Sequence, residues 1–593
     1  MKTKFGINHL NTYILSALLI LLVASPVFHF TFFFDGILVG QQFIISFICI
    51  ICSLFIWSTN LKTEIHYSVF DISIGCFLLY IGIHFFFFPN PYSITSDYLY
   101  FINIVFCSFL IKQSLKNKQA LSDFLKYGIA LVFISQVSLG VYQLLDLKLQ
   151  IPNIDIKGSF DNSGIYSLFL TIHLLILPIF LRSTKTIVRL VALVFALFGL
   201  ILIVLVGSRT AWLALLSGSF LILLNTYRYF LTKVIQANWK YPVAFFTGIV
   251  LCLKYLYSFK QDSADGRMLI WKSTLLLIRD SPLFGNGFGA FGARYNFYQA
   301  TYFSINRNSQ FENLAANSKV AFNEFLQITA DFGIIGLLLF LFVIYQFFRG
   351  CLGLPYPYKI YSISIGIVFL ISFSFSYPFR SVNLHGLLIV ALPLLTFLFQ
   401  SKKISVGKYL KIGLLFCLCL GLVFNGMWIF KQVKARIMWN NAFEAVLEND
   451  YDNAVRLCKK IENLEHDPNF LYFYGSVLLE KQDPQLALTV FKKAELFMAD
   501  NDLYLNIGDC YALMGNKTMA INYYRLSNMV VPHKLLPKFK LFELYIKSGD
   551  FVNGYAIAKE IDTMPVKVNS AVVEYIKESI NTWLKSHTRR SIK

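Results

Sequence analysis

The chain has 593 residues, of which 56% are hydrophobic and only 15% charged, whereas about 25% are charged in a typical soluble domain. This composition excludes a disordered or fibrous chain and argues against a soluble enzyme. The net charge of +20 does not indicate nucleic-acid binding, because residues from 434 onward carry 21 basic and 19 acidic side chains and the excess lies in the apolar region before them. We therefore expect a membrane protein without a nucleic-acid partner.

Apolar stretches long enough to cross a bilayer, about 20 residues each, recur as far as residue 430. We expect thirteen transmembrane helices, at residues 12–34, 37–57, 68–88, 96–111, 123–145, 164–181, 188–206, 210–227, 241–257, 332–348, 360–377, 384–400 and 410–430. The first stretch lacks a small-residue cleavage site, so we expect it to remain as an anchor. Residues 1–433 are thus predicted to form a polytopic helical membrane domain.

The basic residues predict the orientation of these helices, because Lys and Arg in short loops are retained on the cytoplasmic side. With the N-terminus inside, the inner segments hold 19 basic residues, and the short outer loops hold only Lys148, Lys157, Arg209 and Arg380. Thirteen helices then place the long loop at 258–331 and the tail at 434–593 on the outer side.

Three outer arginines are candidate binding groups, because a charged side chain in or beside a membrane helix is costly. Arg209 lies in Gly-Ser-Arg-Thr-Ala-Trp, Arg267 in Asp-Gly-Arg-Met-Leu-Ile-Trp, and Arg380 between the eleventh and twelfth predicted helices. A guanidinium group is always charged and binds phosphate oxygens through a planar fork. Each arginine alone is also explained as an interfacial residue that meets lipid headgroups. Together they suggest a site for pyrophosphate at the membrane surface.

The long outer loop contains most of the remaining candidate residues. Arg267 is followed by an amphipathic stretch that begins at Trp271 and by a turn rich in glycine at 282–291. An aromatic cluster around Tyr295 comes next, and the loop ends with Ala-Phe-Asn-Glu-Phe-Leu at 321–326.

The tail contains an internal repeat. Ala454, Ala487 and Ala520 are each 33 residues apart, and Gly475 and Gly508 keep the same step. The pattern within a unit fits two antiparallel helices with a small residue where they cross, and such units bury their faces by stacking. The tail resembles the tetratricopeptide repeat, so we predict an α-solenoid of that type, with about four units. Unrelated helical hairpins are the alternative.

Taken in order, the outer segments resemble those of the O-antigen ligase and polymerase superfamily of bacterial inner-membrane glycosyltransferases. The matching elements are Gly-Ser-Phe-Asp-Asn at 158–162, Ser-Arg-Thr-Ala-Trp at 208–212, Arg267 with Trp271, and the segments 282–291 and 321–326. The resemblance covers about residues 150–400. It implies an all-α membrane protein of the inner membrane whose repeat tail is periplasmic.

The resemblance also implies a reaction. Enzymes of this superfamily take a glycan from undecaprenyl pyrophosphate and transfer it to an acceptor hydroxyl, with inversion at the anomeric carbon. The acceptor is the lipid A core in ligases, a growing glycan in polymerases, and a protein side chain in oligosaccharyltransferases. We expect neither a metal nor another cofactor, and partners that comprise the donor lipid, the acceptor, membrane lipids and a periplasmic protein bound by the tail.

We assign roles to residues on physical grounds. Arg209 and Arg267 are expected to stabilise the negative charge that develops on the pyrophosphate, with Arg380 as a third candidate. The substrate site is expected to include Trp271, Tyr295 and Asn323.

The chain departs from the family pattern at one position. Related ligases often carry a histidine, the candidate base, at the position of Phe322, and phenylalanine cannot accept a proton. Glu324 and His385 are the candidate replacements, followed by Asp161 and Glu312.

Four functions are compatible with these features. A ligase-type transferase leads, and a polymerase with the same donor is its closest rival; the missing histidine slightly favours this rival or a protein acceptor. A transporter of lipid-linked glycan is disfavoured because its charges should lie at mid-membrane depth, where only Asp71 is found. An inactive scaffold that binds through its tail is the fourth.

Overall fold

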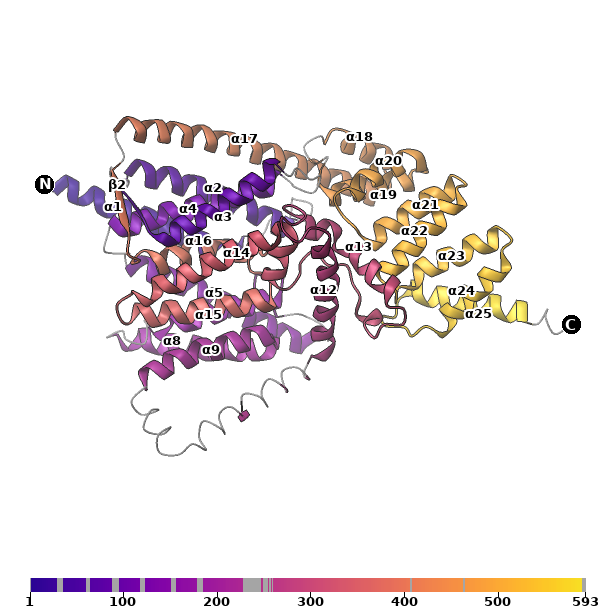
Figure 1. Cartoon of the computed structure of the whole chain (residues 1–593), viewed down its shortest axis with the longest axis horizontal. Coiled ribbons are helices and arrows are strands. Elements are labelled where there is room, and N and C mark those ends of the chain that lie inside the picture. Colours follow the sequence, from indigo (N-terminus) through magenta and orange to yellow (C-terminus); the bar gives the residue numbers. More distant parts are fainter. Residues whose placement is uncertain are drawn as a thin grey trace.

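The computed structural model of the chain consists mainly of helices (Figure 1). It describes residues 2–28, 36–59, 64–87, 95–117, 123–150, 156–178, 185–227, 247–248, 254, 258, 260–405, 408–461, 464 and 466–588. The strands within these ranges form one short pair, so the predicted all-α class is confirmed.

Long apolar helices form the first part of the chain, and their cores are filled by leucine, isoleucine and aromatic side chains. The bounds are α1 Lys2–Val23, η1 Ser25–Val27, α2 Gly36–Thr59, α3 Val69–Phe87, α4 Thr95–Asn117, α5 Asp123–Gln150, α6 Ser163–Ile176, α8 Thr186–Val206 and α9 Arg209–Thr226. Helices distant in sequence lie side by side, because α3 packs against α14 and α9 against α15.

The later part of this bundle follows the outer loop. Its elements are α14 Glu324–Leu352, α15 Tyr358–Phe375, α16 Val382–Thr396 and α17 Lys408–Leu447, with the strands β1 Glu64–Tyr67 and β2 Lys402–Ser405. Helix α17 has 40 residues, so it is about 60 Å long and exceeds the thickness of a bilayer. It runs from the strand pair at one end of the bundle to the tail at the other (Figure 1).

Among the residues that the structure describes, fewer helices are long and apolar enough to cross a membrane than the thirteen predicted. Within the described ranges, seven helices are long and apolar enough to cross a membrane: Gly40–Ser58, Val69–Phe87, Tyr98–Leu115, Phe124–Asp146, Thr186–Val206, Glu324–Leu352 and Tyr358–Phe375. Three further predicted spans coincide with the shorter apolar helices Leu10–Val23, Ser163–Ile176 and Val382–Thr396. These apolar segments have 14 or 15 residues, and a helical segment of that length extends only about 22 Å. The predicted span at 241–257 lies largely outside the described residues.

The one charged residue predicted at mid-membrane depth has a structural explanation. Asp71 lies in the first turn of α3 and accepts hydrogen bonds from the backbone N–H and the hydroxyl of Ser68, both 2.7 Å long. Lys112 of α4 approaches its carboxylate to 2.7 Å, and both side chains are buried. This buried ion pair joins α3 to α4 beside the strand pair, so Asp71 is no isolated charge of the kind expected in a transporter.

The outer loop and the tail lie at the same end of the bundle (Figure 1). The loop contains α12 Gln261–Asp280, α13 Ala290–Ile305 and η2 Glu312–Leu314. The tail contains α18 Tyr451–Lys459, α19 Pro468–Glu480, α20 Pro484–Glu495, α21 Asn501–Leu513, α22 Lys517–Val530, α23 Leu535–Lys547, α24 Phe551–Thr563 and α25 Ala571–Thr588.

Consecutive tail helices pack on one another in pairs, and the glycines of the repeat lie where they cross. A Cβ atom added at Gly475 would lie 2.5 Å from the Phe491 ring, and one at Gly508 would lie 2.5 Å from the Tyr524 ring. No larger residue fits at either crossing. The same contact thus recurs in successive pairs, as the sequence repeat predicts; the assignment to the tetratricopeptide class remains a prediction.

Candidate functional site

A cavity of about 250 Å³ lies where the N-termini of α6 and α9 meet α12 of the outer loop. It is lined by residues of both helix starts, including Ser163 and Thr210, and by Lys260, Arg209 and Arg267. The predicted pair of arginines, 58 positions apart in the sequence, therefore lies in one cavity.

Both helix N-termini at the cavity are fixed by side-chain caps. Asn162 accepts a hydrogen bond from the backbone N–H of Gly164 at 2.8 Å, and Ser208 accepts one from Ala211 at 3.4 Å. Gly207 ends α8 with a φ of +65°, which a glycine adopts without strain, and so permits the tight turn into α9. Unpaired N–H groups and the helix dipole make such N-termini favourable places for anions.

Arg267 is held in place by contacts on two sides. Its Nη1 donates a hydrogen bond of 2.8 Å to the backbone oxygen of Phe375, at the end of α15. The guanidinium also lies over the Phe322 ring, 5.3 Å from the ring centre. Burial and the nearby charge of Arg209 lower the pKa of Arg267 to about 10, so the side chain is still charged at neutral pH. Two like charges in one cavity favour the binding of an anion.

Phe322 lies at the cavity in a conformation that is unusual for its residue type. Its φ is +52°, in the left-handed region that L-residues rarely adopt. The turn is fixed at the preceding residue, because the Ala321 oxygen accepts a hydrogen bond from Trp271 Nε1 and the Ala321 N–H donates to Gln327. The Phe322 ring meets that of Tyr377 edge-on, with centres 5.2 Å apart. This turn positions the ring between Arg267 and Tyr377.

The sequence of this region has a recognisable counterpart among known protein families. Residues 192–341 match the O-antigen ligase family. The match begins in α8, ends in α14 and includes Arg209, Arg267 and Phe322. No curated protein matches the chain. Together with the apolar helices, this match supports a multi-pass membrane enzyme of the ligase or polymerase type.

Three other predicted site residues lie in a separate polar network beside the cavity. Arg380 forms an ion pair of 2.5 Å with the fully buried Asp331. Glu324 accepts a hydrogen bond from the Phe379 N–H at 2.8 Å, and His385 contacts the Phe379 oxygen at 3.1 Å. Glu324 and His385 are only 2% and 7% exposed. None of these side chains lines the cavity, so the structure does not bring them together with Arg209 and Arg267.

The remaining predicted residues stabilise the loop next to the cavity. Tyr295 is fully buried, stacks on Phe291 and donates a hydrogen bond to Gln299. Asn323 caps α14 by accepting from the Leu326 N–H at 3.0 Å. Together with the hydrogen bond from Trp271 to Ala321, these interactions fix the conformation of the loop. Trp271, Tyr295 and Asn323 do not line the cavity, so the lining residues are the ones placed to contact a substrate.

A break in α14 ties this helix to the glycine-rich turn at 282–291. The backbone at Gly333 has a φ of +68°, which interrupts the helix. The carbonyls and N–H groups freed by this break pair with the turn: Asn286 N–H donates to the Ala330 oxygen, and Ile334 N–H donates to the Pro282 oxygen. The glycine-rich turn at 282–291 and the helix break at Gly333 therefore form one structural unit.

Lys260 and Tyr377 are among the cavity residues that were not assigned roles from the sequence. Lys260 lies at the edge of the cavity and donates to the Val206 oxygen at 3.4 Å. Tyr377 lies three residues before Arg380, and the charge of the arginine made Arg380 the candidate in this segment. Only the packing of α15 against α9 identifies Tyr377 as a cavity residue, because that contact is not visible in the chain order.

Proposed function

We propose that this protein transfers a glycan from polyprenyl pyrophosphate to an acceptor hydroxyl, at the periplasmic face of a bacterial inner membrane. The observation that carries the proposal is the convergence of Arg209, Arg267 and two capped helix N-termini on one cavity. Guanidinium groups and helix N-termini are the groups that bind phosphate oxygens. The match of residues 192–341 to the O-antigen ligase family supports the same donor chemistry.

The proposed mechanism relies on preorganised positive charge. Pyrophosphate is a good leaving group, so breaking the anomeric bond chiefly requires stabilisation of the charge that develops on its oxygens. Arg267 is already held by Phe375 and Phe322 and therefore needs little rearrangement when that charge appears. The acceptor oxygen attacks the opposite face of the anomeric carbon, which inverts its configuration, while its proton passes to a base. In this proposal the reaction uses no metal ion.

Among the candidate bases, Asp161 lies closest to the cavity. Its neighbours Asn162 and Ser163 line the cavity. Burial and the charge of Asp161 together raise the pKa of Tyr377, which is also a lining residue. Desolvation raises the pKa of the Asp161 carboxyl above its ordinary value. A carboxylate with a raised pKa is a stronger base, so we assign to Asp161 the removal of the acceptor proton. Glu324, His385 and Glu312 are bonded elsewhere or lie beside the tail.

The acceptor separates three versions of the proposal. A ligase uses the lipid A core, a polymerase uses a growing glycan, and an oligosaccharyltransferase uses a protein side chain. Phe322 at the cavity, in place of histidine, favours an acceptor other than that of histidine-containing ligases. Deletion of the gene distinguishes the three: free lipopolysaccharide core indicates a ligase, single-repeat products indicate a polymerase, and unglycosylated proteins indicate an oligosaccharyltransferase.

The donor assignment is tested by transfer from a synthetic polyprenyl-pyrophosphate glycan to membranes of the deletion strain. We expect Arg267→Ala to abolish transfer while the protein remains in the membrane, and Arg267→Lys to retain a small part of it because lysine keeps the charge but loses the fork. Arg279→Ala is the matched control, since Arg279 is an exposed arginine at the end of the same helix. Full transfer by Arg267→Ala would reject the pyrophosphate assignment.

A further inference from the structure

Helix α13 of the outer loop lies between the tail and the segment that leads to the cavity. Two of its amide side chains, Asn296 and Gln299, are buried, with exposed fractions of 3% and 1%. They are three residues apart on the helix and therefore project from the same face. Each bonds the tail on one side and the returning loop segment, residues 316–318, on the other.

Each of the two amides forms one hydrogen bond with the tail and one with the returning loop segment. Asn296 Nδ2 donates to the Ala499 oxygen of the tail at 2.6 Å, and its Oδ1 accepts from the Ser318 N–H at 3.0 Å. Gln299 Nε2 donates to the Val530 oxygen of the tail at 2.7 Å and to the Ala316 oxygen at 3.2 Å. Each side chain therefore bridges the tail and the returning loop segment.

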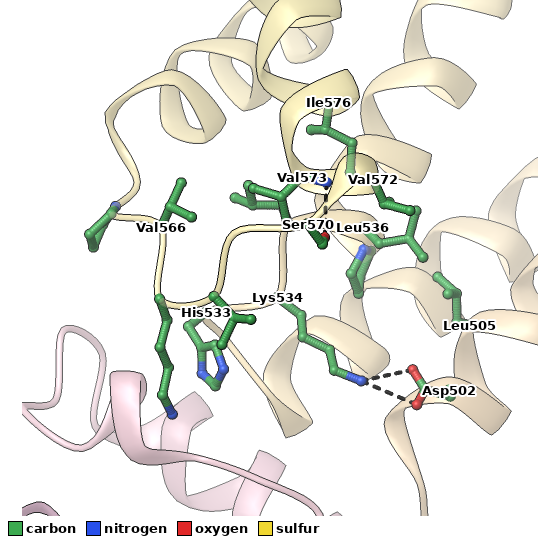
Figure 2. A pocket seen from close by; sticks show the side chains of 15 residues that line it. Asp502, Leu505, His533, Lys534, Leu536, Val566, Ser570, Val572, Val573 and Ile576 are labelled. Carbon is green, nitrogen blue, oxygen red and sulfur yellow. Dashed lines mark hydrogen bonds and ion pairs between the residues drawn. The ribbon is translucent and has the colours of Figure 1, made fainter. Parts of the chain in front are cut away.

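The tail contributes a repeated edge to this contact. The segments at the starts of α19, α21 and α23 each contact the loop, and these helices start 33 and 34 residues apart. At the start of α19, Lys319 contacts Asn469. At the start of α21, Asn317 bonds Asp500 and Asn501, and the Ala499 N–H donates to the Ala293 oxygen. At the start of α23, His533 contacts the Glu312 oxygen. The loop passes beside His533 in Figure 2, where this residue also borders a tail cavity of about 320 Å³. One edge of the repeat array is thus occupied by the chain's own loop.

Short connections lead from this contact to the candidate site. Ser318 is only four residues from Phe322. Phe291 and Tyr295 of α13 pack on Leu277 of α12 and on Ala321, and Tyr295 donates a hydrogen bond to Gln299. A displacement of α13 therefore changes the position of the Phe322 turn and of the helix that carries Arg267.

We propose that the tail is an intramolecular clamp that positions the outer loop, with Asn296 and Gln299 as positioning residues. Its repeat edge binds residues 293–319 of the same chain and thereby holds the Phe322 turn and α12 in place. This role goes beyond the recruitment of a partner. Its catalytic consequence rests on the proposed transfer of glycan, whereas the contact itself does not.

The contact is tested in the full-length protein in membranes. A cysteine pair, Ala293→Cys with Ala499→Cys, places thiols on two residues whose backbone atoms are 2.7 Å apart, and we expect a short, reducible thiol cross-linker to join them. Asn296→Asp combined with Gln299→Glu keeps the acceptor oxygens but places carboxylates against the tail carbonyls, so the cross-link yield should fall severalfold. Asn306→Asp is the matched control, because its exposed amide bonds only within α13. Absence of the cross-link in the otherwise unchanged protein would overturn the proposal.

The positioning role is tested with the same variants. In the Asn296→Asp, Gln299→Glu protein we expect kcat for glycan transfer to fall about tenfold or more, with a smaller change in KM for the donor. Cross-linking the cysteine pair in that background should restore the rate, and reduction should remove it again. Independently of transfer, the thiol of a Phe322→Cys variant should react faster with a polar maleimide when Asn296→Asp and Gln299→Glu release the tail. An unchanged labelling rate in the released protein would overturn the clamp. Absence of transfer by the unchanged protein, with the labelling change still present, would reject the proposed function alone.

Discussion

The guanidinium of Arg267 lies over the ring of Phe322, with the central carbon 5.3 Å from the ring centre. The same arginine donates to the Phe375 oxygen, so an aromatic face and a helix end fix its orientation together. Phe322 stands where related ligases often carry a histidine. In this protein the position holds an arginine in place, and any proton transfer falls to another group.

Loss of the aromatic face should weaken catalysis modestly. We expect Phe322→Leu to lower kcat/KM for the donor about two- to fivefold, because a partly exposed cation–π contact contributes about 0.5–1 kcal/mol. Phe322→Tyr keeps the ring and is the control. Steady-state transfer measurements check both, and a Phe322→Leu protein that matches the parent would show that the contact does not orient Arg267.

Pyrophosphate should stabilise the protein through the two arginines. A ligand at about 100 times its Kd stabilises the folded state by about 2.7 kcal/mol, so inorganic pyrophosphate should raise the midpoint of thermal unfolding in detergent. We expect Arg209→Gln and Arg267→Gln to abolish this shift and Arg279→Gln to keep it. Sodium chloride of equal ionic strength controls for screening. A shift that persists in both cavity variants would place the anion elsewhere.

The assignment of the base predicts a pH dependence. Asp161 must be deprotonated to accept a proton, and its pKa is raised, so the transfer rate should fall as pH decreases toward this raised pKa. We expect Asp161→Asn to lower kcat about 100-fold or more and to remove this acidic limb. Glu324→Gln provides the comparison, because glutamine can still accept the hydrogen bond from Phe379. Loss of transfer in Glu324→Gln, with Asp161→Asn active, would exchange the two roles.

The ion pair of Arg380 with Asp331 should contribute to stability. Asp331 is buried and Arg380 is about one third exposed, so Asp331→Asn should cost about 1–3 kcal/mol, less than the loss of a fully buried pair. Asp452→Asn, at an exposed pair with Lys481 in the tail, should leave stability nearly unchanged. Thermal unfolding of the purified proteins measures both. Equal effects would show that burial of the Arg380 pair is unimportant.

Gly333 should not tolerate a side chain. A Cβ atom at this position would lie 2.1 Å from the Leu283 oxygen, and the φ of +68° is itself strained for alanine. The backbone strain alone costs about 1–3 kcal/mol, so we expect Gly333→Ala to lower the amount of folded protein in the membrane sharply. Gly353→Ala, at the end of the same helix, meets its nearest atom at 3.5 Å and should be neutral. Normal folding of Gly333→Ala would contradict the break in α14.

The sequence by itself determined the helical class, the candidate pair of arginines and the repeat of the tail. Each depends on a local property: apolar length, a charged side chain beside an apolar stretch, or a fixed spacing between Ala454, Ala487 and Ala520. Within the described part of the chain, fewer helices are long enough to cross a membrane than were predicted. A helix such as α6 is apolar over too short a length, and burial among its neighbours explains its composition as well as a bilayer does.

Only the tertiary structure decided which candidates share a site. Arg209 and Arg267 lie in one cavity because α9 and α12 meet there, whereas Glu324 and His385 are bonded to the segment at Phe379 beside it. The contact of Asn296 with Ala499 joins residues 203 positions apart and has no local signature. Charge, hydropathy and spacing are properties of short segments, but the convergence of side chains depends on how distant helices pack, which a single sequence does not state.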